Sequence, residues 1–514
     1  MSDDKRWVGA CGIGIGILAN SLDFSMVNTG IPAIQAHFGA TLAALQWIMT
    51  GLGVAMTALL VTAGRSADLF GRKRIYLLGL LLFALSVLLC GLAPTMLWLI
   101  IGRVLEGISF SIVLPVSLGL IVHQFPASGK GKAIAFWSAV IGVGLGLGPL
   151  IGGLFISYLS WRFLFFVNLP IIGLSLLMVI LFVRESRDEQ SGRKIDPKGV
   201  LFLIVGTGSL VLGIVQGPVW GWSSLPMILL YGLAAAGFIG LAFFERRART
   251  PILPIRLFLN RMFFVCTACN FTLVFCLWAV FFLVPIYLSN LREILPLTMG
   301  LMMLALAIPY SLFSLLMGNL AEKTGPKRWL LGGFGLWAVA AAGMSLFSAT
   351  TSTWWILLAL LATGATFGTL WPAAATFALS TLPKRLAGVA TGSLATMQEL
   401  GGTLGVAISG TLFRVAAGRM VFPKLRHLGI TVDHADRHTI RSLLADPTRI
   451  QDNVLELKIF EPSVLLNFFQ EAFSAGFSAA MWLLAGVGAF SFLLVLVAMK
   501  GGPHPVVHPE DVGH

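Results

Sequence analysis

The stretch Gly64-Arg-Ser-Ala-Asp68-Leu-Phe-Gly71-Arg-Lys73-Arg74 decides how the rest of the chain is interpreted, because the chain contains a second copy of it. That copy, Gly318-Asn-Leu-Ala-Glu322-Lys-Thr-Gly325-Pro-Lys327-Arg328, has the same spacing, with every matched position displaced by 254 residues. Both copies are polar and basic, and each lies between two long apolar stretches. The repeat therefore predicts two halves built on one plan, in each of which this segment connects two helices.

The composition around the repeat is that of a membrane protein. Hydrophobic residues make up 57% of the 514 positions and charged residues only 11%, whereas about a quarter of the residues in soluble domains are charged. A helix needs about 20 apolar residues to cross a bilayer, and many such stretches follow one another along this chain. Soluble enzymes and nucleic-acid-binding proteins are therefore disfavoured, and the net charge of +13 needs another explanation.

Apolar stretches bounded by charges or by Pro and Gly predict fourteen membrane-spanning helices. They cover residues 9–31, 45–63, 75–94, 96–121, 133–157, 163–183, 199–217, 225–244, 263–288, 297–319, 329–348, 353–379, 388–413 and 472–499. An even number of spans places both termini on one side of the membrane. With that side cytoplasmic, most Lys and Arg fall in cytoplasmic connectors, which is the usual bias of membrane proteins and accounts for the net charge without nucleic acid.

If spans one to six and nine to fourteen are the two halves, the chain divides into four parts. Residues 1–183 form an N-terminal six-helix bundle, and residues 184–262 hold two further helices with charged cytoplasmic connectors. Residues 263–499 form a C-terminal six-helix bundle that includes a long outer loop, 414–471, and residues 500–514 are a cytoplasmic tail. Many secondary transporters are built from such repeats, with the substrate site between the halves near the middle of the bilayer.

Four motifs make the chain resemble the major facilitator superfamily, and within it the fourteen-span drug:proton antiporters of the multidrug efflux type. They are Leu22-Asp23-Phe-Ser-Met-Val-Asn28, the connector Gly64 to Arg74, Arg103-Val-Leu-Glu106-Gly107, and Gly144-Leu-Gly-Leu-Gly148-Pro149-Leu-Ile-Gly152-Gly153. The resemblance implies an all-α polytopic membrane protein with two six-helix bundles plus two inserted helices. It also implies a multi-pass protein of the plasma membrane, the inner membrane of a bacterium, with both termini cytoplasmic.

Two charged residues are expected to meet inside the membrane. Asp23 and Arg103 lie at about the same depth of the first and fourth spans, at a rise of about 1.5 Å per residue. A charge at the centre of a spanning helix costs about 3 kcal/mol on insertion scales, so such residues usually pair or line a watery cavity. Two interpretations follow: Asp23 takes up a proton and Arg103 sets when it is released, or the two form a static ion pair.

Two further acids are candidates for proton coupling. Glu106 follows Arg103 by three residues and so shares its helix face. It either competes with Asp23 for Arg103 or is a second proton site. Glu399 lies near the middle of the thirteenth span and is either a proton site of the C-terminal half or a neutral acid packed in the bundle.

The first copy of the connector is a candidate gate. The resemblance implies that its charged residues make contacts that break during transport, with Asp68 meeting the positive N-terminal end of a neighbouring helix. The residues concerned are Gly64, Asp68, Gly71, Arg72, Lys73 and Arg74. The alternative is that these basic residues only hold the connector in the cytoplasm.

The fifth span carries a stripe of small residues. Gly144, Gly148 and Gly152 are spaced by four, which lets another helix approach closely, and Gly153 extends the motif. Pro149 removes one helical hydrogen bond and can kink the helix. The stripe predicts either a hinge or tight packing without motion, and these residues carry no chemistry.

The sequence points to no cofactor, no metal and no enzyme. Cys266 and Cys269 have metal-like spacing, but no second ligand pair lies near them, and no stretch resembles a nucleotide-binding loop. The expected partners are a small-molecule substrate, protons and the lipid bilayer. The outer loop 414–471 is expected to cap the cavity or to meet a periplasmic adaptor protein.

The resemblance implies an antiporter that exports amphipathic or cationic small molecules by alternating access as protons enter. The main alternative is a dedicated exporter of one endogenous metabolite, such as a siderophore or a lipid. A membrane receptor or structural protein without transport is the third possibility, which the acids within the membrane disfavour.

Overall fold

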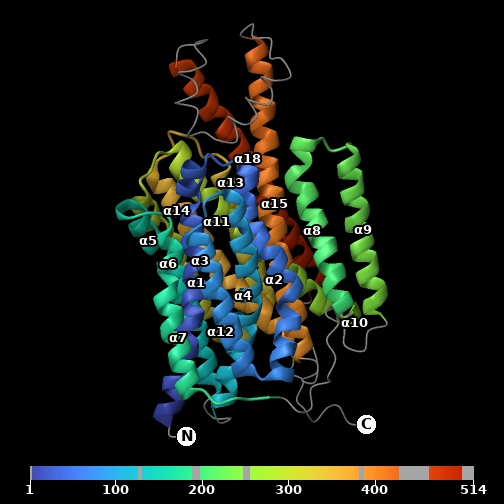
Figure 1. The fold of residues 1–514 in the computed structure, drawn as a ribbon. Helices are drawn as coiled ribbons and strands as arrows, with labels where there is room; N and C mark the ends of the chain where they lie inside the picture. Colours follow the sequence, from blue (N-terminus) through green and yellow to red (C-terminus); the bar gives the residue numbers. More distant parts are fainter. Residues whose placement is uncertain are drawn as a thin grey trace.

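The computed structural model describes residues 3–125, 130–187, 197–246, 255–380, 387–427 and 462–499, and within these ranges it is built of helices without strands (Figure 1). We call the side on which α1 begins the inner side and the opposite side the outer side. The N-terminal half consists of α1 (Asp3–Phe38), α2 (Leu42–Phe70), α3 (Arg72–Gly91), α4 (Met96–Gln124), α5 (Lys130–Tyr158), the short α6 (Phe163–Phe166) and α7 (Asn168–Phe182).

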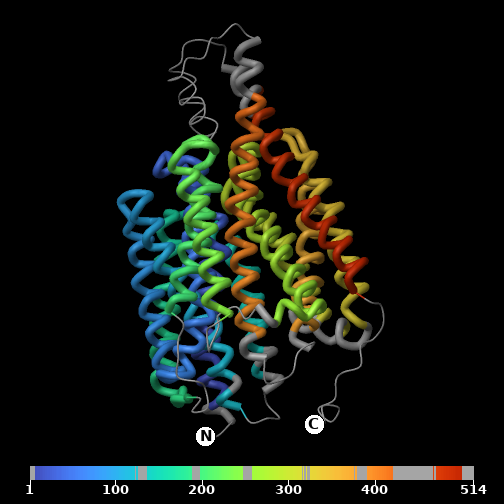
Figure 2. Tube along the Cα trace, turned by 90° about the vertical axis from the view of Figure 1, so that its right-hand side faces the viewer, coloured from blue at the N-terminus to red at the C-terminus, as the bar shows by residue number. Residues whose placement is uncertain are grey.

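The C-terminal half repeats this plan after two inserted helices. The insert is α8 (Pro197–Trp220) and α9 (Leu225–Glu245). The C-terminal half consists of α10 (Ile255–Phe258), α11 (Arg261–Ile286) with a π-helical turn η2 (Tyr287–Leu291), α12 (Pro296–Thr324), α13 (Pro326–Met344), α14 (Thr353–Ser380), α15 (Ala387–His427) and α18 (Pro462–Ala498). Figure 2 shows the two halves side by side, the N-terminal half at the left and the C-terminal half at the right.

Thirteen of the described helices are long and apolar enough to cross a bilayer. The remaining expected span, 329–348, corresponds to α13, which is rich in Gly and Ala and begins with two basic residues, so it is less apolar than the others. It packs against α14 and α18. The prediction of an all-α fold with two six-helix bundles and two inserted helices is therefore confirmed, and only the helix ends differ.

The outer loop is shorter than expected at both ends. Helix α15 continues past the predicted end of its span to His427, and α18 begins at Pro462. Residues 428–461 lie outside the described part of the chain.

The two copies of the repeated connector adopt the same backbone turn. Gly71 separates α2 from α3 with φ 109°, and Gly325 separates α12 from α13 with φ 82°. A residue with a Cβ atom is strained at such positive φ angles, whereas glycine is not. Glycine therefore allows the two helices to follow each other without a loop. The sequence repeat is therefore a structural repeat as well.

The glycine stripe of α5 packs against two different helices. A Cβ atom added to Gly144 or Gly148 would lie 2.6 Å or 2.8 Å from the Cβ atoms of Ser21 and Ser25 of α1. The Ser25 hydroxyl also donates to the Gly144 carbonyl oxygen at 3.2 Å. Gly153 instead faces the Pro296 carbonyl of α12, in the other half. The stripe thus provides close packing both within the N-terminal half and between the halves.

The inserted hairpin is fixed to both halves by α8, which contacts α2 and α15 (Figure 1). Pro218 has no N–H group, so the Ile214 carbonyl loses its usual partner in the helix. The hydroxyl of Thr411 in α15 donates to that carbonyl at 3.0 Å. Arg414 donates to the neighbouring carbonyl of Val215 at 2.5 Å. Two polar residues of α15 therefore hydrogen-bond to the carbonyl groups of α8 near its proline, and these bonds connect the two helices.

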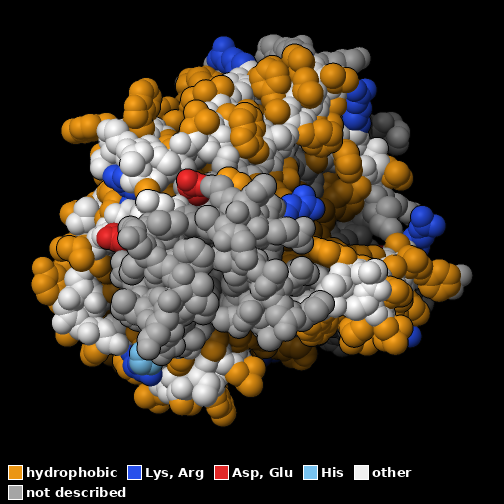
Figure 3. All heavy atoms as spheres, turned by 90° about the horizontal axis from the view of Figure 1, so that it is seen from above, with side chains coloured by type: hydrophobic (Ala, Val, Ile, Leu, Met, Phe, Trp, Pro, Cys, Tyr) orange, Lys and Arg blue, Asp and Glu red, His pale blue; other side chains and the backbone are white. Residues whose placement is uncertain are grey.

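The circumference of the molecule is apolar. Seen along the helix axes, hydrophobic side chains make up most of the rim, with a few Lys and Arg side chains among them (Figure 3). On the inserted hairpin, for example, Leu229 is 64% exposed and Ile239 is 70% exposed. An apolar surface of this extent is expected to face lipid.

Candidate functional site

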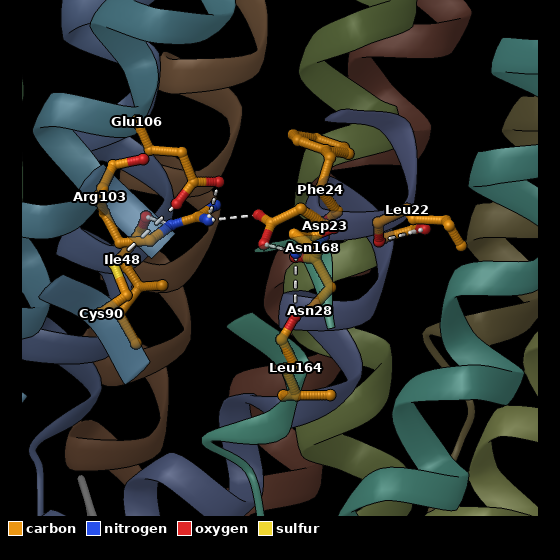
Figure 4. A network of polar contacts seen from close by, with 12 residues as sticks. Leu22, Asp23, Phe24, Asn28, Ile48, Cys90, Arg103, Glu106, Leu164 and Asn168 are labelled. Atoms are coloured by element: carbon orange, nitrogen blue, oxygen red, sulfur yellow. Dashed lines mark hydrogen bonds and ion pairs between the residues drawn. The ribbon is translucent and has the colours of Figure 1, made fainter. Parts of the chain in front are cut away.

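Asp23 and Arg103 meet inside the N-terminal half, as their depths in the sequence predicted (Figure 4). Nη1 of Arg103 in α4 lies 2.8 Å from Oδ2 of Asp23 in α1. Both side chains are fully buried. The other carboxylate oxygen, Oδ1, accepts a hydrogen bond of 2.9 Å from the amide of Asn168 at the start of α7. The Asp23 carboxylate is thus held by two helices other than its own.

Glu106 binds the same guanidinium. Its Oε1 lies 2.7 Å from Nη1 of Arg103, so one nitrogen is shared by two carboxylates. Nε of Arg103 donates to the Ile48 carbonyl of α2 at 3.2 Å, and Nη2 has no hydrogen-bond partner among the described residues. We call Asp23, Arg103 and Glu106 the buried triad.

The charge of the triad depends on a single proton. An arginine side chain stays protonated in proteins, whereas each carboxyl group can be neutral or negative. With both carboxylates ionised the triad has a net charge of −1, and with one protonated it is neutral. A buried charge without compensation is costly, so the form with one carboxyl group protonated is the one in which the charges of this site balance.

The motif around Arg103 explains how α2 comes so close. A Cβ atom added to Gly107 would collide with the backbone of Leu52. Glycine at this position lets α2 and α4 touch, and this contact brings the Ile48 carbonyl within reach of Arg103. Gly107 is therefore a packing residue, and the close approach that it allows lets Arg103 donate to the Ile48 carbonyl.

Glu399 lies apart from the triad, in α15 of the C-terminal half. Its side chain is 8% exposed, and its Oε2 atom has no hydrogen-bond partner within the part of the chain that the structure describes. The preceding residue, Gln398, donates to Asn270 of α11 at 2.8 Å. The structure therefore brings together three of the four predicted proton-coupling residues and leaves Glu399 in a separate polar region.

The connector forms contacts within the N-terminal half. Asp68 pairs with Arg72 at 2.7 Å, at the junction of α2 and α3. The carboxylate that meets a helix N-terminus is Glu185, which accepts from the backbone N–H groups of Lys73 at 2.9 Å and Arg74 at 3.3 Å. Glu185, which the sequence did not single out, therefore caps the N-terminus of α3, and the contact of Asp68 with a neighbouring helix stays a prediction.

On the outer side, polar contacts join the two halves. Gln35 of α1 accepts a hydrogen bond of 3.0 Å from Asn290 in the π-helical turn. Gln46 of α2 donates to the carbonyls of Val406 and Ala407 in α15, each at 3.0 Å. The outer ends of the halves are therefore held together.

Among the described residues, no group of three or more His, Cys, Asp or Glu side chains is arranged to hold a metal ion. Cys266 and Cys269 are buried, free thiols.

Sequence reasoning missed Asn168 as a site residue. An amide at the start of an apolar helix is the one signal that could have identified it. The backbone carbonyl of Ile48 has no sequence signal.

Comparisons with known proteins support the resemblance. The family model described as Major Facilitator Superfamily matches residues 13–406. Multidrug resistance protein Stp of Mycobacterium tuberculosis is 31% identical over 84% of this chain and 80% of its own length. Tetracenomycin C resistance and export protein of Streptomyces glaucescens is 31% identical over 82% of this chain and 78% of its own length.

Solved structures of transporters share the fold. The crystal structure of a bacterial homologue of the human lysosomal transporter Spinster, in an inward-facing and unoccupied conformation, matches with a TM-score of 0.68. The match covers 96% of this chain and 98% of that one at 17% sequence identity.

Proposed function

Because the chain belongs to the major facilitator superfamily, a superfamily of membrane transporters, we propose that it is a proton-coupled antiporter that exports amphipathic or cationic small molecules. Its relatives include multidrug and antibiotic resistance proteins. The proposal places the protein in the bacterial inner membrane with both termini in the cytoplasm. It assigns no catalytic reaction to this protein.

The buried triad is the observation that carries the proposal. One fixed positive charge lies between two carboxylates at 2.8 Å and 2.7 Å, without solvent exposure. Removing a proton from this site creates a net negative charge in a medium that stabilises charge poorly. Proton uptake and release at Asp23 or Glu106 would therefore change the energy of the site and bias the arrangement of the helices that hold it. Glu399 is proposed as a separate proton site, because it is buried and its Oε2 has no hydrogen-bond partner among the described residues.

The contacts at the two ends support alternating access. On the outer side, Gln35 and Gln46 bind the C-terminal half, so outward opening requires these bonds to break. On the inner side, Gly64 to Arg74 form the proposed gate, where Arg72, Lys73 and Glu185 would exchange partners. The glycines and Pro149 of α5 would let this helix slide against its neighbours.

The domain boundaries and the adaptor remain proposals. The proposed boundaries at residues 183 and 499 directly follow the ends of α7 and α18, whereas the one at residue 262 falls in the first turn of α11, which begins at Arg261. An adaptor protein would bind at the outer loop 414–471, most of which lies outside the described residues.

A second candidate is a dedicated exporter of one compound. Two relatives are named for single compounds, tetracenomycin C and riboflavin. Transport of one metabolite without any effect of unrelated lipophilic cations would favour this candidate.

Inverted membrane vesicles with an acid interior test the proposal. A pH-sensitive dye would follow the release of protons while lipophilic cations are added. Wild-type protein should release protons when a compound is added, and Asp23→Asn should not. Glu293→Gln, which changes an exposed acid near the outer end of α11, is the matched control and should behave as wild type. Compound transport without proton movement would overturn the coupling.

A further inference from the structure

Trp278 of α11 lies where helices of both halves meet. Its side chain is 4% exposed. Its ring centroid is 5.0 Å from that of Phe24 in α1. A Cβ atom added to Gly402 of α15 would lie 2.5 Å from the indole ring, and one added to Gly53 of α2 would lie 3.0 Å from it. Two helices of each half therefore surround or support this ring.

Polar groups that have no hydrogen-bond partner among the described residues lie one or two helical turns from this ring, towards the inner side. Helices α2 and α15 are antiparallel, and they touch at Gly53 and Thr403 and again at Val61 and Gly392. Thr57 lies between these two contacts on α2. Thr396 and Glu399 lie between them on α15, and both are within two helical turns of Thr403 on the same face. The three side chains therefore belong to one short stretch of the boundary between the halves.

None of these three polar groups is satisfied by the described protein. Thr57 is 1% exposed, Thr396 is fully buried and Glu399 is 8% exposed. The two hydroxyl oxygens and Oε2 of Glu399 have no hydrogen-bond partner among the described residues. Buried polar atoms are nearly always hydrogen-bonded. A cluster of three exceptions beside an aromatic pair therefore indicates a place where a ligand supplies the partners.

We infer that Trp278 and Phe24 form the aromatic platform of the substrate site, and that Thr57 and Thr396 bind the polar groups of the substrate. The class of ligand is a planar aromatic molecule that carries amine or hydroxyl groups. Aromatic faces bind flat rings and cations, and each hydroxyl can donate or accept a hydrogen bond. A molecule at this place touches both halves at once, so its binding responds to their relative movement.

This inference rests on the proposed export function, and its test separates the two. Purified protein in lipid nanodiscs would be titrated with ethidium, a planar aromatic cation with two amine groups, and binding followed by fluorescence anisotropy. Trp278→Leu should weaken binding about tenfold, because it removes the ring face, whereas Trp278→Phe keeps a ring and should weaken it less than about threefold. Trp355→Leu removes an exposed indole on the lipid side and should leave binding unchanged.

The hydroxyl groups are tested with isosteric variants. Thr57→Val and Thr396→Val should each weaken ethidium binding by about fivefold, in the range of one lost hydrogen bond. They should leave the binding of tetraphenylphosphonium unchanged, because this cation has no hydrogen-bond donor. Trp278→Leu should weaken the binding of both compounds.

The outcomes distinguish the two proposals. Wild-type affinity for ethidium in a folded Trp278→Leu protein would overturn the aromatic platform while leaving export in place. If this variant does not fold, Phe24→Leu is tested in its place. Its binding of ethidium should be about fivefold weaker, and unchanged binding would contradict the aromatic platform. A wild-type protein that neither binds nor exports any compound of the panel would overturn the proposed function, and the inference with it.

Discussion

In the N-terminal half, Arg103 lies between Asp23 and Glu106, and both carboxylates accept hydrogen bonds from it. In the C-terminal half, one oxygen of Glu399 has no partner among the residues that the structure describes, and an uncharged pair, Gln398 and Asn270, lies beside it. The two halves share a backbone plan, down to the positive φ angles of Gly71 and Gly325. Their buried polar residues nevertheless differ in charge and in hydrogen bonding.

The comparison separates what the repeat preserves from what it does not. The turn between two helices depends on backbone geometry alone, so both halves keep a glycine there. A buried charged cluster depends on side chains from several helices and has no structural role that both halves need. We therefore expect proton coupling to depend mainly on the N-terminal half and substrate recognition on the boundary with the C-terminal half.

The largest effect is expected from Arg103→Ala. This change leaves two buried carboxylates without their counter-charge, which typically destabilises a protein by about 3–5 kcal/mol. Unfolding in detergent, followed by circular dichroism during heating, measures the loss. The triple variant with Asp23→Asn and Glu106→Gln added should recover most of the stability but not the export. If the single variant melts like wild type, the triad does not hold the half together.

The second largest effect is expected when the buried acids of the two halves, Glu106 and Glu399, are each replaced by glutamine. Glu106→Gln makes the triad neutral without a proton, so the release of protons per exported compound should be lost. Glu399→Gln should reduce proton release less, because this side chain takes no part in the triad. Vesicle assays that record protons and compound together measure the ratio. Equal losses in both variants would show that coupling is shared evenly between the halves.

A smaller effect is expected from Asn168→Ala. Hydrogen bonds to charged groups contribute about 1.5–3 kcal/mol, and this change removes the one that Asn168 donates to Asp23. Thermal unfolding should show a loss of about 2 kcal/mol. Asn270→Ala is the matched change in the C-terminal half. It breaks a bond between two neutral amides and should cost about half as much.

The smallest effects compare the two connectors. Gly71→Ala and Gly325→Ala each place a methyl group where φ is positive, at a cost of about 1–2 kcal/mol. Gly71→Ala should be the more harmful, because its Cβ atom would also lie 2.7 Å from the Glu185 carboxylate. Chemical denaturation of both variants measures the difference. A greater loss in Gly325→Ala would mean that backbone strain, and not the contact with Glu185, sets the cost at Gly71.

Sequence reasoning reached the fold because membrane helices are specified locally. Each span has its own apolar run, and the repeated connector relates the halves. It also predicted that Asp23 and Arg103 meet, because a charge within a membrane is costly unless it is paired or hydrated. The bond between Asn168 and Asp23 joins residues 145 positions apart, and Glu185 caps a helix 112 residues before it. Such contacts depend on how helices are arranged around one another, which periodicity and composition do not specify.

The contact between Trp278 and Phe24 could not be predicted from the sequence for the same reason. Aromatic residues in a membrane protein lie at the lipid interface, in packed cores or in a cavity, and the sequence pattern is alike in all three. Only the packing of four helices distinguishes Trp278 from an exposed residue such as Trp355.

The ring of Trp278 occupies space left by one glycine from each half, and this has an evolutionary consequence. A Cβ atom at Gly402 would collide with the indole, whereas one at Gly53 would lie 3.0 Å from the indole and collide with Thr403, so these positions cannot diverge independently. Relatives that keep tryptophan at this position are expected to keep both glycines, whereas those with a smaller residue are free to lose the glycine at position 402. Covariation among these three positions would thus record which members of the superfamily have inherited the same binding chemistry.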